Sequence, residues 1–313
     1  MKSIAHRSPG SVPGSLVAAT GSTLARSRWC VIGAAALFST GGAAIKGTAL
    51  TAFQVAGFRS GIAAIAFLLL FREARRGFGW DLLPAAFSYA GTLVCFVFAT
   101  KMTTSAAAIF LQSTAPIWIL LLAPMLLKEK IRLGDLPAVG LAAIGLALVF
   151  FGSRDPAATA PQPGIGNVVA LVSGLFYALL MITLRRLSRD SPAGNDRSLP
   201  ATVLGNAIAL AFTLPFALPV TVFRASDLAS LLYLGVIQIG VAYWLFSKGL
   251  SRLPALEVSL LVLLEPVLNP LWTWIFQGEK PTPLALCGGG LMIAALAARV
   301  LMQRTRAPQI LVD

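Results

Sequence analysis

Residues 110–130 read FLQSTAPIWILLLAPMLLKEK, and residues 260–280 read LLVLLEPVLNPLWTWIFQGEK. Both stretches are long and apolar, both hold a proline near the middle (Pro116 and Pro266), and both end in Glu-Lys. The two copies lie 150 residues apart, and Leu, Gly and Leu residues further along match at the same offset. The chain of 313 residues therefore repeats one pattern at about half its length.

The composition of the chain indicates a membrane protein. Hydrophobic residues make up 57% of the sequence, charged residues only 12%, and the mean hydropathy is +0.81, whereas soluble domains carry about a quarter charged residues. A helix that crosses a bilayer needs about 20 mostly apolar residues, and ten such runs follow one another. They cover 29–47, 52–71, 81–100, 104–127, 134–151, 165–184, 198–222, 229–247, 254–276 and 283–302.

The basic residues predict the orientation of these spans. Of the 25 Lys and Arg residues, nineteen fall in the segments on the side of the N-terminus, five fall on the other side, and Arg59 falls within a span. Because Lys and Arg accumulate in cytoplasmic loops, we expect both termini in the cytoplasm. The formal charge of +13 is then a topology signal and a contact for anionic headgroups, and we expect no nucleic-acid partner.

The repeat divides the ten spans into two halves. It pairs the fourth span with the ninth, and Leu37-Phe38-Ser39 in the first span answers to Leu175-Phe176-Tyr177 in the sixth. Because five spans is an odd number, the second half enters the membrane from the opposite side. This predicts an all-α membrane protein of ten transmembrane helices in two five-helix inverted-topology repeats, as in secondary transporters. The expected divisions are a disordered cytoplasmic tail (1–28), the first repeat (29–151), a periplasmic linker (152–164), the second repeat (165–302) and a cytoplasmic tail (303–313).

Several kinds of chemistry are disfavoured by what the sequence lacks. Its three cysteines stand singly in apolar runs, and its one histidine, His6, lies in the polar N-terminal segment. Neither a metal site nor a disulfide framework has this spacing, and no P-loop or H-E-x-x-H motif occurs. We expect no enzyme, no catalytic residue, no metal and no cofactor. An intramembrane enzyme is the alternative from another functional class.

Three features of the sequence carry a family resemblance. They are the proline-centred fourth span followed by Lys128-Glu129-Lys130, the run from Ser259 to Pro266 followed by Gly278-Glu279, and Arg59 in the second span. The chain resembles ten-helix EamA-type members of the drug/metabolite transporter superfamily over residues 29–302. The resemblance implies export of small metabolites, often amino acids, across the bacterial inner membrane, with aromatic amino acids as the specific expectation. It also implies that the fifth and tenth spans stand at the periphery, as in a monomer or weak homodimer.

Two ionisable residues inside spans are candidates for the transport site, because charges in the membrane are costly and mark function. Glu265 precedes Pro266, which removes a backbone hydrogen bond and kinks a helix. Its carboxylate is expected either to bind an amino group or a proton, or to stabilise the broken helix. Arg59 is expected either to meet a substrate carboxylate or to bind the carbonyl groups of a helix C-terminus.

Polar and aromatic side chains at similar depth extend this candidate site, since amides need partners away from lipid and aromatic rings stack on flat or cationic ligands. The candidates for the cavity are Phe38, Arg59, Tyr89, Gln112, Trp118, Phe176, Tyr177, Gln238, Tyr243 and Glu265, and the candidates for helix kinks are Pro116 and Pro266. A sugar-phosphate or nucleotide-sugar exchanger on the same fold is the alternative. It needs at least two inward-facing basic groups, and only Arg59 is clearly placed at depth.

The charged residues at the ends of the spans are expected to have structural roles. Lys46, Lys101 and Lys248 can extend their stems to water from the membrane edge. Glu129 and Glu279 are expected to cap or anchor the helix that follows each of them, without touching substrate.

Overall fold

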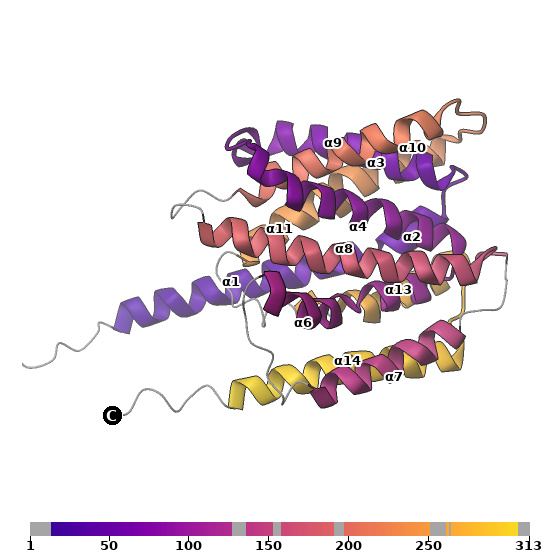
Figure 1. The fold of residues 1–313 in the computed structure, drawn as a ribbon. Coiled ribbons are helices and arrows are strands. Elements are labelled where there is room, and N and C mark those ends of the chain that lie inside the picture. The colour runs from indigo at the N-terminus through magenta and orange to yellow at the C-terminus, as the bar shows by residue number, and fades with distance from the viewer. Residues whose placement is uncertain are drawn as a thin grey trace, which may run out of the picture.

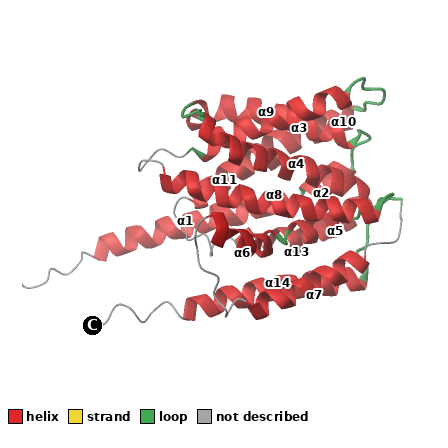
Figure 2. Cartoon of the chain, viewed as in Figure 1, coloured by secondary structure: helices red, strands yellow, loops and turns green. Residues whose placement is uncertain are grey.

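The computed structural model describes residues 14–126, 136–152, 158–190, 197–250, 261–262 and 264–305. Within these ranges the regular elements are all helices (Figure 2). In chain order they are α1 (Gly14–Ser39), α2 (Gly41–Lys46), α3 (Ala52–Leu70), the 3-10 turns η1 (Arg72–Arg75) and η2 (Trp80–Leu82), α4 (Leu83–Met102), α5 (Ser105–Gln112), α6 (Ala115–Leu126), α7 (Leu136–Gly152), α8 (Pro163–Asp190), α9 (Ser198–Ala217), α10 (Ala225–Leu232), the π-helix η4 (Tyr233–Val241), α11 (Ala242–Leu250), α13 (Leu264–Gln277) and α14 (Pro283–Thr305).

Six helical segments in the described ranges are long and apolar enough to cross a membrane. They are Leu24–Lys46, Ala52–Leu70, Trp80–Met102, Pro163–Leu184, Ser198–Ala217 and Ala225–Gly249. Shorter apolar helices lie at Ser105–Ile119, Ala143–Gly152 and Pro283–Ala295. The chain is therefore a multi-pass, all-helical membrane protein, since helices satisfy their own backbone groups in lipid.

The first helix is longer than expected. It begins at Gly14 rather than near Trp29, so the expectation of a disordered segment up to residue 28 is wrong for residues 14–28. No proline interrupts this stretch of sequence, and a helix that is already formed adds residues at little further cost. The helix of the first span therefore continues into it.

Two of the spans are interrupted. The first breaks at Thr40, between α1 and α2, and the fourth breaks at Ser113 and Thr114, between α5 and α6. Pro116 is the second residue of α6, where its missing N–H costs little, so the expected kink is a full break just before the proline. Pro266 lies in the first turn of α13. Residue 263, in the turn that precedes this proline, lies outside the described ranges, so the kink expected at Pro266 stays a prediction.

Helices from the two halves of the chain pack against each other in swapped pairs. In one set α4 packs on α8, while α11 and η4 pack on α1. In another α5 and α6 pack on α8, while α13 packs on α1 and α2. A third set joins α4 with α9 and α3 with η4. Other contacts join equivalent helices, α3 with α9, α5 with α13 and α7 with α14. Duplicated halves related by a two-fold operation produce this pattern.

The pair formed by α7 and α14 stands at one edge of the bundle (Figure 1). Its two backbones touch, because a Cβ on Gly145 would lie 2.6 Å from the carbonyl oxygen of Gly288, and a Cβ on Gly288 would lie 2.5 Å from that of Gly145. Small residues allow such close packing in membranes. The pair meets the other helices mainly through α5, where a Cβ on Gly289 would lie 2.5 Å from the ring of Phe110.

Candidate functional site

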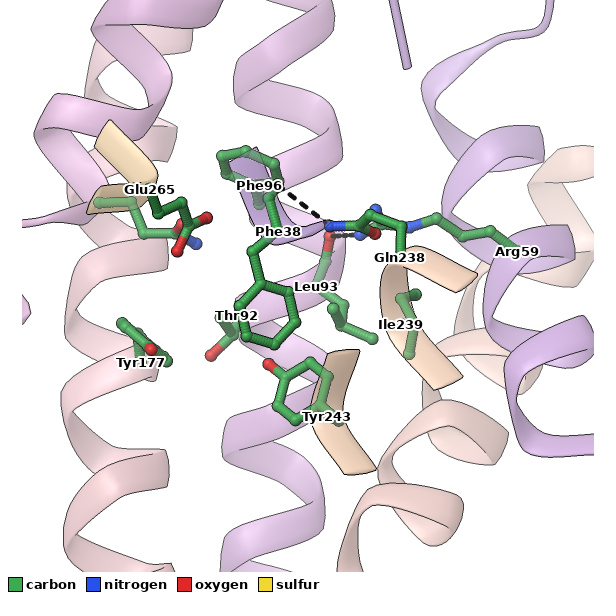
Figure 3. A pocket seen from close by; sticks show the side chains of 11 residues that line it. Phe38, Arg59, Thr92, Leu93, Phe96, Tyr177, Gln238, Ile239, Tyr243 and Glu265 are labelled. Atoms are coloured by element: carbon green, nitrogen blue, oxygen red, sulfur yellow. Dashed lines mark hydrogen bonds between the residues drawn. The ribbon is translucent and has the colours of Figure 1, made fainter. Parts of the chain in front are cut away.

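A cavity lies among helices of both halves, with an empty volume of about 440 Å³ that includes open space at its mouth. Most of its lining is aromatic or apolar, and a few polar groups converge on it (Figure 3), as is typical of small-molecule sites. The lining residues are Phe38, Arg59, Thr92, Leu93, Phe96, Gln112, Tyr177, Gln238, Ile239, Tyr243 and Glu265.

Seven of the ten expected cavity residues are brought together here, and Tyr89, Trp118 and Phe176 are not in the lining. Tyr89 is buried behind it, where its ring lies 4.9 Å from that of Tyr243. Phe176 covers the bare backbone of Gly91 on α4, because a Cβ there would lie 2.6 Å from the ring. Trp118 lies on α6, and its buried indole N–H has no partner in the described ranges.

Four lining residues were missed by the sequence analysis: Thr92, Leu93, Phe96 and Ile239. Three of them belong to one face of α4. A sequence signal for that face exists, because Ser88, Thr92 and Thr100 are spaced at multiples of four and share it. Leu93 and Ile239 carry no such signal, since an apolar side chain looks the same toward lipid or toward a cavity.

Arg59 projects from α3 and is 1% exposed. Its Nη2 donates to the carbonyl of Leu93 at 3.0 Å, and its buried Nε has no partner in the described ranges. That carbonyl lies in the middle of α4 and not at a helix C-terminus. No carboxylate in the described part of the chain pairs with the guanidinium. A buried cation without a counter-ion is unfavourable, so the site is electrostatically incomplete.

Glu265 faces the same cavity from the first turn of α13 (Figure 3). Glu265 is half-buried, and no described residue forms a hydrogen bond or ion pair with its carboxyl group. The positive end of the α13 dipole favours a negative charge at this position, which agrees with the structural role considered for it. Arg59 lies on the other side of the cavity in Figure 3, so an acidic and a basic side chain line opposite walls.

Aromatic rings occupy the space between the side chains of Arg59 and Glu265 (Figure 3). The rings of Phe38 and Tyr243 meet edge to face, with centroids 4.9 Å apart, and Phe246 lies 6.3 Å from both. Tyr177 projects into the cavity from α8. Such a wall can hold a flat apolar group or stack on a cation.

The two glutamines of the cavity differ in how far their amides are already bonded. Gln112 Nε2 donates to Ser173 Oγ at 2.7 Å, and this hydroxyl donates to the Thr92 carbonyl at 3.1 Å. That chain of bonds joins α5, α8 and α4. Gln238 Nε2 donates to the Phe38 carbonyl at 3.4 Å, while its buried Oε1 has no partner in the described ranges.

Lys46 and Glu279 form an ion pair away from the cavity, with Nζ and Oε2 3.2 Å apart and side chains 5% and 4% exposed. Lys46 also donates to the carbonyl groups of Thr103, at 2.9 Å, and Thr159. The backbone N–H of Ser105 donates to Glu279. Burial raises the pKa of the Glu279 carboxyl, although Lys46 and the Ser105 N–H oppose this.

This ion pair corrects two expectations. Lys46 turns inward rather than toward water, and Glu279 caps the N-terminus of α5 rather than that of the following helix α14. The reason is tertiary, because the C-terminus of α2 meets the N-terminus of α5, and the two helix dipoles favour a cation at the first and an anion at the second.

The other span-end charges have mixed outcomes. Lys101 also turns inward and donates to the carbonyl oxygen and hydroxyl of Thr48, at 2.8 and 3.0 Å. Lys248 stays half-exposed beside Glu73 and Trp244. Glu129 lies outside the described ranges.

An all-helical membrane bundle, with a cavity of aromatic and polar side chains between its two halves, defines the class of a polytopic membrane transporter. The profile of the EamA-like transporter family matches residues 27–151 and again residues 164–300. The chain belongs to that family, whose members are transporters and not enzymes. The two matches coincide with the duplicated halves seen in the helix packing.

Individual relatives agree with this assignment. An uncharacterized transporter of Archaeoglobus fulgidus is 27% identical over 66% of this chain and 70% of its own length. The pseudopaline exporter CntI of Pseudomonas aeruginosa is 25% identical over 83% of this chain and 91% of its own. A crystal structure with 20% sequence identity covers 90% of this chain and 98% of its own with a TM-score of 0.62, which supports the fold.

Proposed function

We propose that the chain exports small metabolites across the bacterial inner membrane, with amino acids, aromatic ones among them, as the first candidates. The observation that carries this proposal is Arg59, a buried cation at the cavity that no described carboxylate neutralises. A substrate carboxylate would supply the missing charge through charge-assisted hydrogen bonds. The guanidinium then needs no protein partner of its own.

The rest of the cavity is suited to the other parts of an amino acid. The carboxylate of Glu265 on the far wall supplies negative charge for an ammonium group, or takes up a proton. The rings of Phe38, Tyr177 and Tyr243 offer contacts for an aromatic side chain. A dipolar ligand with a flat apolar group therefore matches the chemistry of the walls.

Alternating access between two inverted five-helix repeats is the proposed transport mechanism. The swapped helix pairs support it, since each half then contributes equivalent walls to one central cavity. An odd number of spans in each half inverts the second half and gives an even total, so both termini lie on one side, which the Lys and Arg distribution assigns to the cytoplasm. Export as the direction is supported by the similarity to a protein named a pseudopaline exporter.

The sugar-phosphate or nucleotide-sugar exchanger has weaker support. Phosphate binding calls for several converging basic groups, and among the described lining residues only Arg59 is basic. One transport assay distinguishes an amino acid exporter from a sugar-phosphate or nucleotide-sugar exchanger.

Purified protein is reconstituted into liposomes preloaded with unlabelled solute, and uptake of the labelled solute is followed. We expect protein-dependent counterflow of phenylalanine, its loss in Arg59→Gln and in Glu265→Gln, and no change in Arg76→Gln, an exposed matched control. Counterflow of a sugar phosphate with matching preload, and none of any amino acid, would replace this proposal by the exchanger. Equal phenylalanine transport by a well-folded Arg59→Gln protein would remove Arg59 from the site.

A further inference from the structure

Gln238 lies at the cavity on the π-helix η4 and is 6% exposed. A π-helix of nine residues is unusual, and such segments frequently occur at functional sites. The amide N–H of Gln238 is bonded to Phe38, but its Oε1 is an acceptor without a donor in the described ranges. A buried acceptor of this kind is unfavourable unless something else supplies the donor.

The orientation of this amide follows from its neighbours. The oxygen of Phe38 that it contacts is an acceptor, so a flipped amide would bring two oxygens together. A Cβ on Gly41 would lie 2.7 Å from Nε2, so the amide nitrogen rests on the bare backbone where the first span breaks. The unpartnered oxygen is therefore directed away from Phe38.

Arg59 reaches the cavity from the helix next to η4. The helices α3 and η4 pack closely, since a Cβ on Gly235 would lie 2.9 Å from the backbone oxygen of Arg59. Both head groups are on the side of the cavity away from Glu265 (Figure 3). Within the described part of the chain, Nε of Arg59 has no acceptor and Oε1 of Gln238 has no donor.

We infer that Gln238 accepts a hydrogen bond from a donor on the carbon next to the substrate carboxylate, and so determines specificity for acids that carry one. The inference rests on the proposed function, because it places the carboxylate on Arg59. A site built to hydrogen-bond a substrate group discriminates against analogues that lack it, since its own buried polar atom is then left unpaired. α-Amino acids satisfy the site, and acids without an α-substituent do not.

The sharpest probes are 3-phenyllactate and 3-phenylpropanoate, which share charge and shape and differ by one α-hydroxyl donor. Glu265 responds to a positive charge, which neither probe has, so the pair isolates the contribution of Gln238. The affinity of each probe is measured with purified full-length protein through the shift that it causes in the unfolding midpoint. We expect 3-phenyllactate to bind on the order of tenfold more tightly than 3-phenylpropanoate.

The variants assign this preference to a residue. Gln238→Met removes the acceptor and is expected to abolish the difference between the probes. Gln238→Leu also removes the acceptor and is expected to abolish the difference as well, whereas Glu265→Gln is expected to retain it. If one Gln238 variant fails to fold and binds neither probe, the other Gln238 variant is used for the test. A single folding failure therefore does not decide the result.

An unchanged preference in Gln238→Met would overturn the inference, and so would a preference lost in Glu265→Gln alone. Equal binding of the two probes by the wild-type protein would overturn it while leaving the proposed function in place, provided that phenylalanine counterflow is observed. Absence of that counterflow together with absence of binding would refute the proposed function itself, and this inference with it.

Discussion

Arg59 and Lys46 are both buried cations of the first half, yet their surroundings differ. Lys46 lies 3.2 Å from Glu279 and donates to backbone carbonyl groups, whereas Arg59 has one carbonyl contact and no carboxylate in the described chain. Ion pairs inside proteins compensate the loss of water around each charge only when both partners are present. The Lys46–Glu279 pair therefore connects parts of the structure, whereas Arg59, which lacks a carboxylate partner in the described chain, is the better candidate for binding a ligand.

The surroundings of the Lys46 pair extend the contrast. Around the break in the first span, α13 is hydrogen-bonded to α1 and α2. Asn269 Nδ2 donates to the Ser39 carbonyl at 3.0 Å, Trp272 Nε1 donates to Ser39 Oγ at 2.9 Å, and Gln277 Nε2 donates to the Ala43 carbonyl at 3.2 Å. This region has its partners within the protein, whereas Arg59 Nε and Gln238 Oε1 at the cavity have none among the described residues.

The largest expected effect is on transport in Arg59→Gln. Counterflow of phenylalanine should fall by more than about 100-fold, because the charge that holds the carboxylate is removed. The unfolding midpoint should stay the same or rise, since an uncompensated buried charge is also removed. Counterflow and thermal unfolding of the same preparation test both halves of this expectation. A large fall in stability would show that Arg59 has the structural role of Lys46.

The next effect is on stability in Glu279→Gln, which leaves Lys46 buried without its counter-ion. Breaking such a pair destabilises a protein by about 3–5 kcal/mol, so the unfolding midpoint in detergent should fall markedly. The pKa of the Glu279 carboxyl is raised, so burial disfavours its charged form more than Lys46 and the Ser105 N–H favour it. The double variant Lys46→Met/Glu279→Leu should therefore recover most of the lost stability. A double variant as unstable as the single one would contradict this account.

A smaller effect is expected in Trp272→Phe, which keeps an aromatic ring and removes the donor to Ser39 Oγ. A hydrogen bond of this kind contributes about 1 kcal/mol. Thermal unfolding should detect a modest loss, and counterflow per folded molecule should be unchanged. Loss of counterflow without loss of stability would instead place this bond in the transport cycle.

The smallest effect is expected in Glu73→Gln at the surface. Glu73 lies 3.6 Å from Lys248, and both side chains are about half exposed. Exposed ion pairs contribute about 0–1 kcal/mol, so the unfolding midpoint should hardly move. A shift as large as that of Glu279→Gln would mean that burial is not what separates the two pairs.

Hydropathy and the internal repeat predict much of this architecture, because lipid requires long apolar helices wherever the chain crosses. The same argument finds Arg59, Gln238 and Glu265, since each is polar at a depth where polarity is costly. The roles of these residues in binding stay predictions.

The inward turn of Lys46 could not be predicted in this way. A lysine at the end of a span reaches water by default, and only the meeting of α2 with α5 supplies other partners. The break at Thr40 likewise has no proline in its own span to announce it. Leu93 and Ile239 reach the cavity through helix packing, which their apolar side chains do not reveal.

The π-helix η4 has a consequence for insertions and deletions. Each of its backbone bonds spans one residue more than in an α-helix, so the segment behaves as an α-helix into which a residue has been inserted. Deleting one residue between Tyr233 and Val241 would let ordinary winding return. Because the π-helix had absorbed the extra residue, Tyr243 and Phe246 would still point toward Phe38, whereas a deletion in an ordinary α-helix would rotate every later side chain by about 100°. A one-residue deletion is therefore better tolerated here than in the α-helices of the bundle.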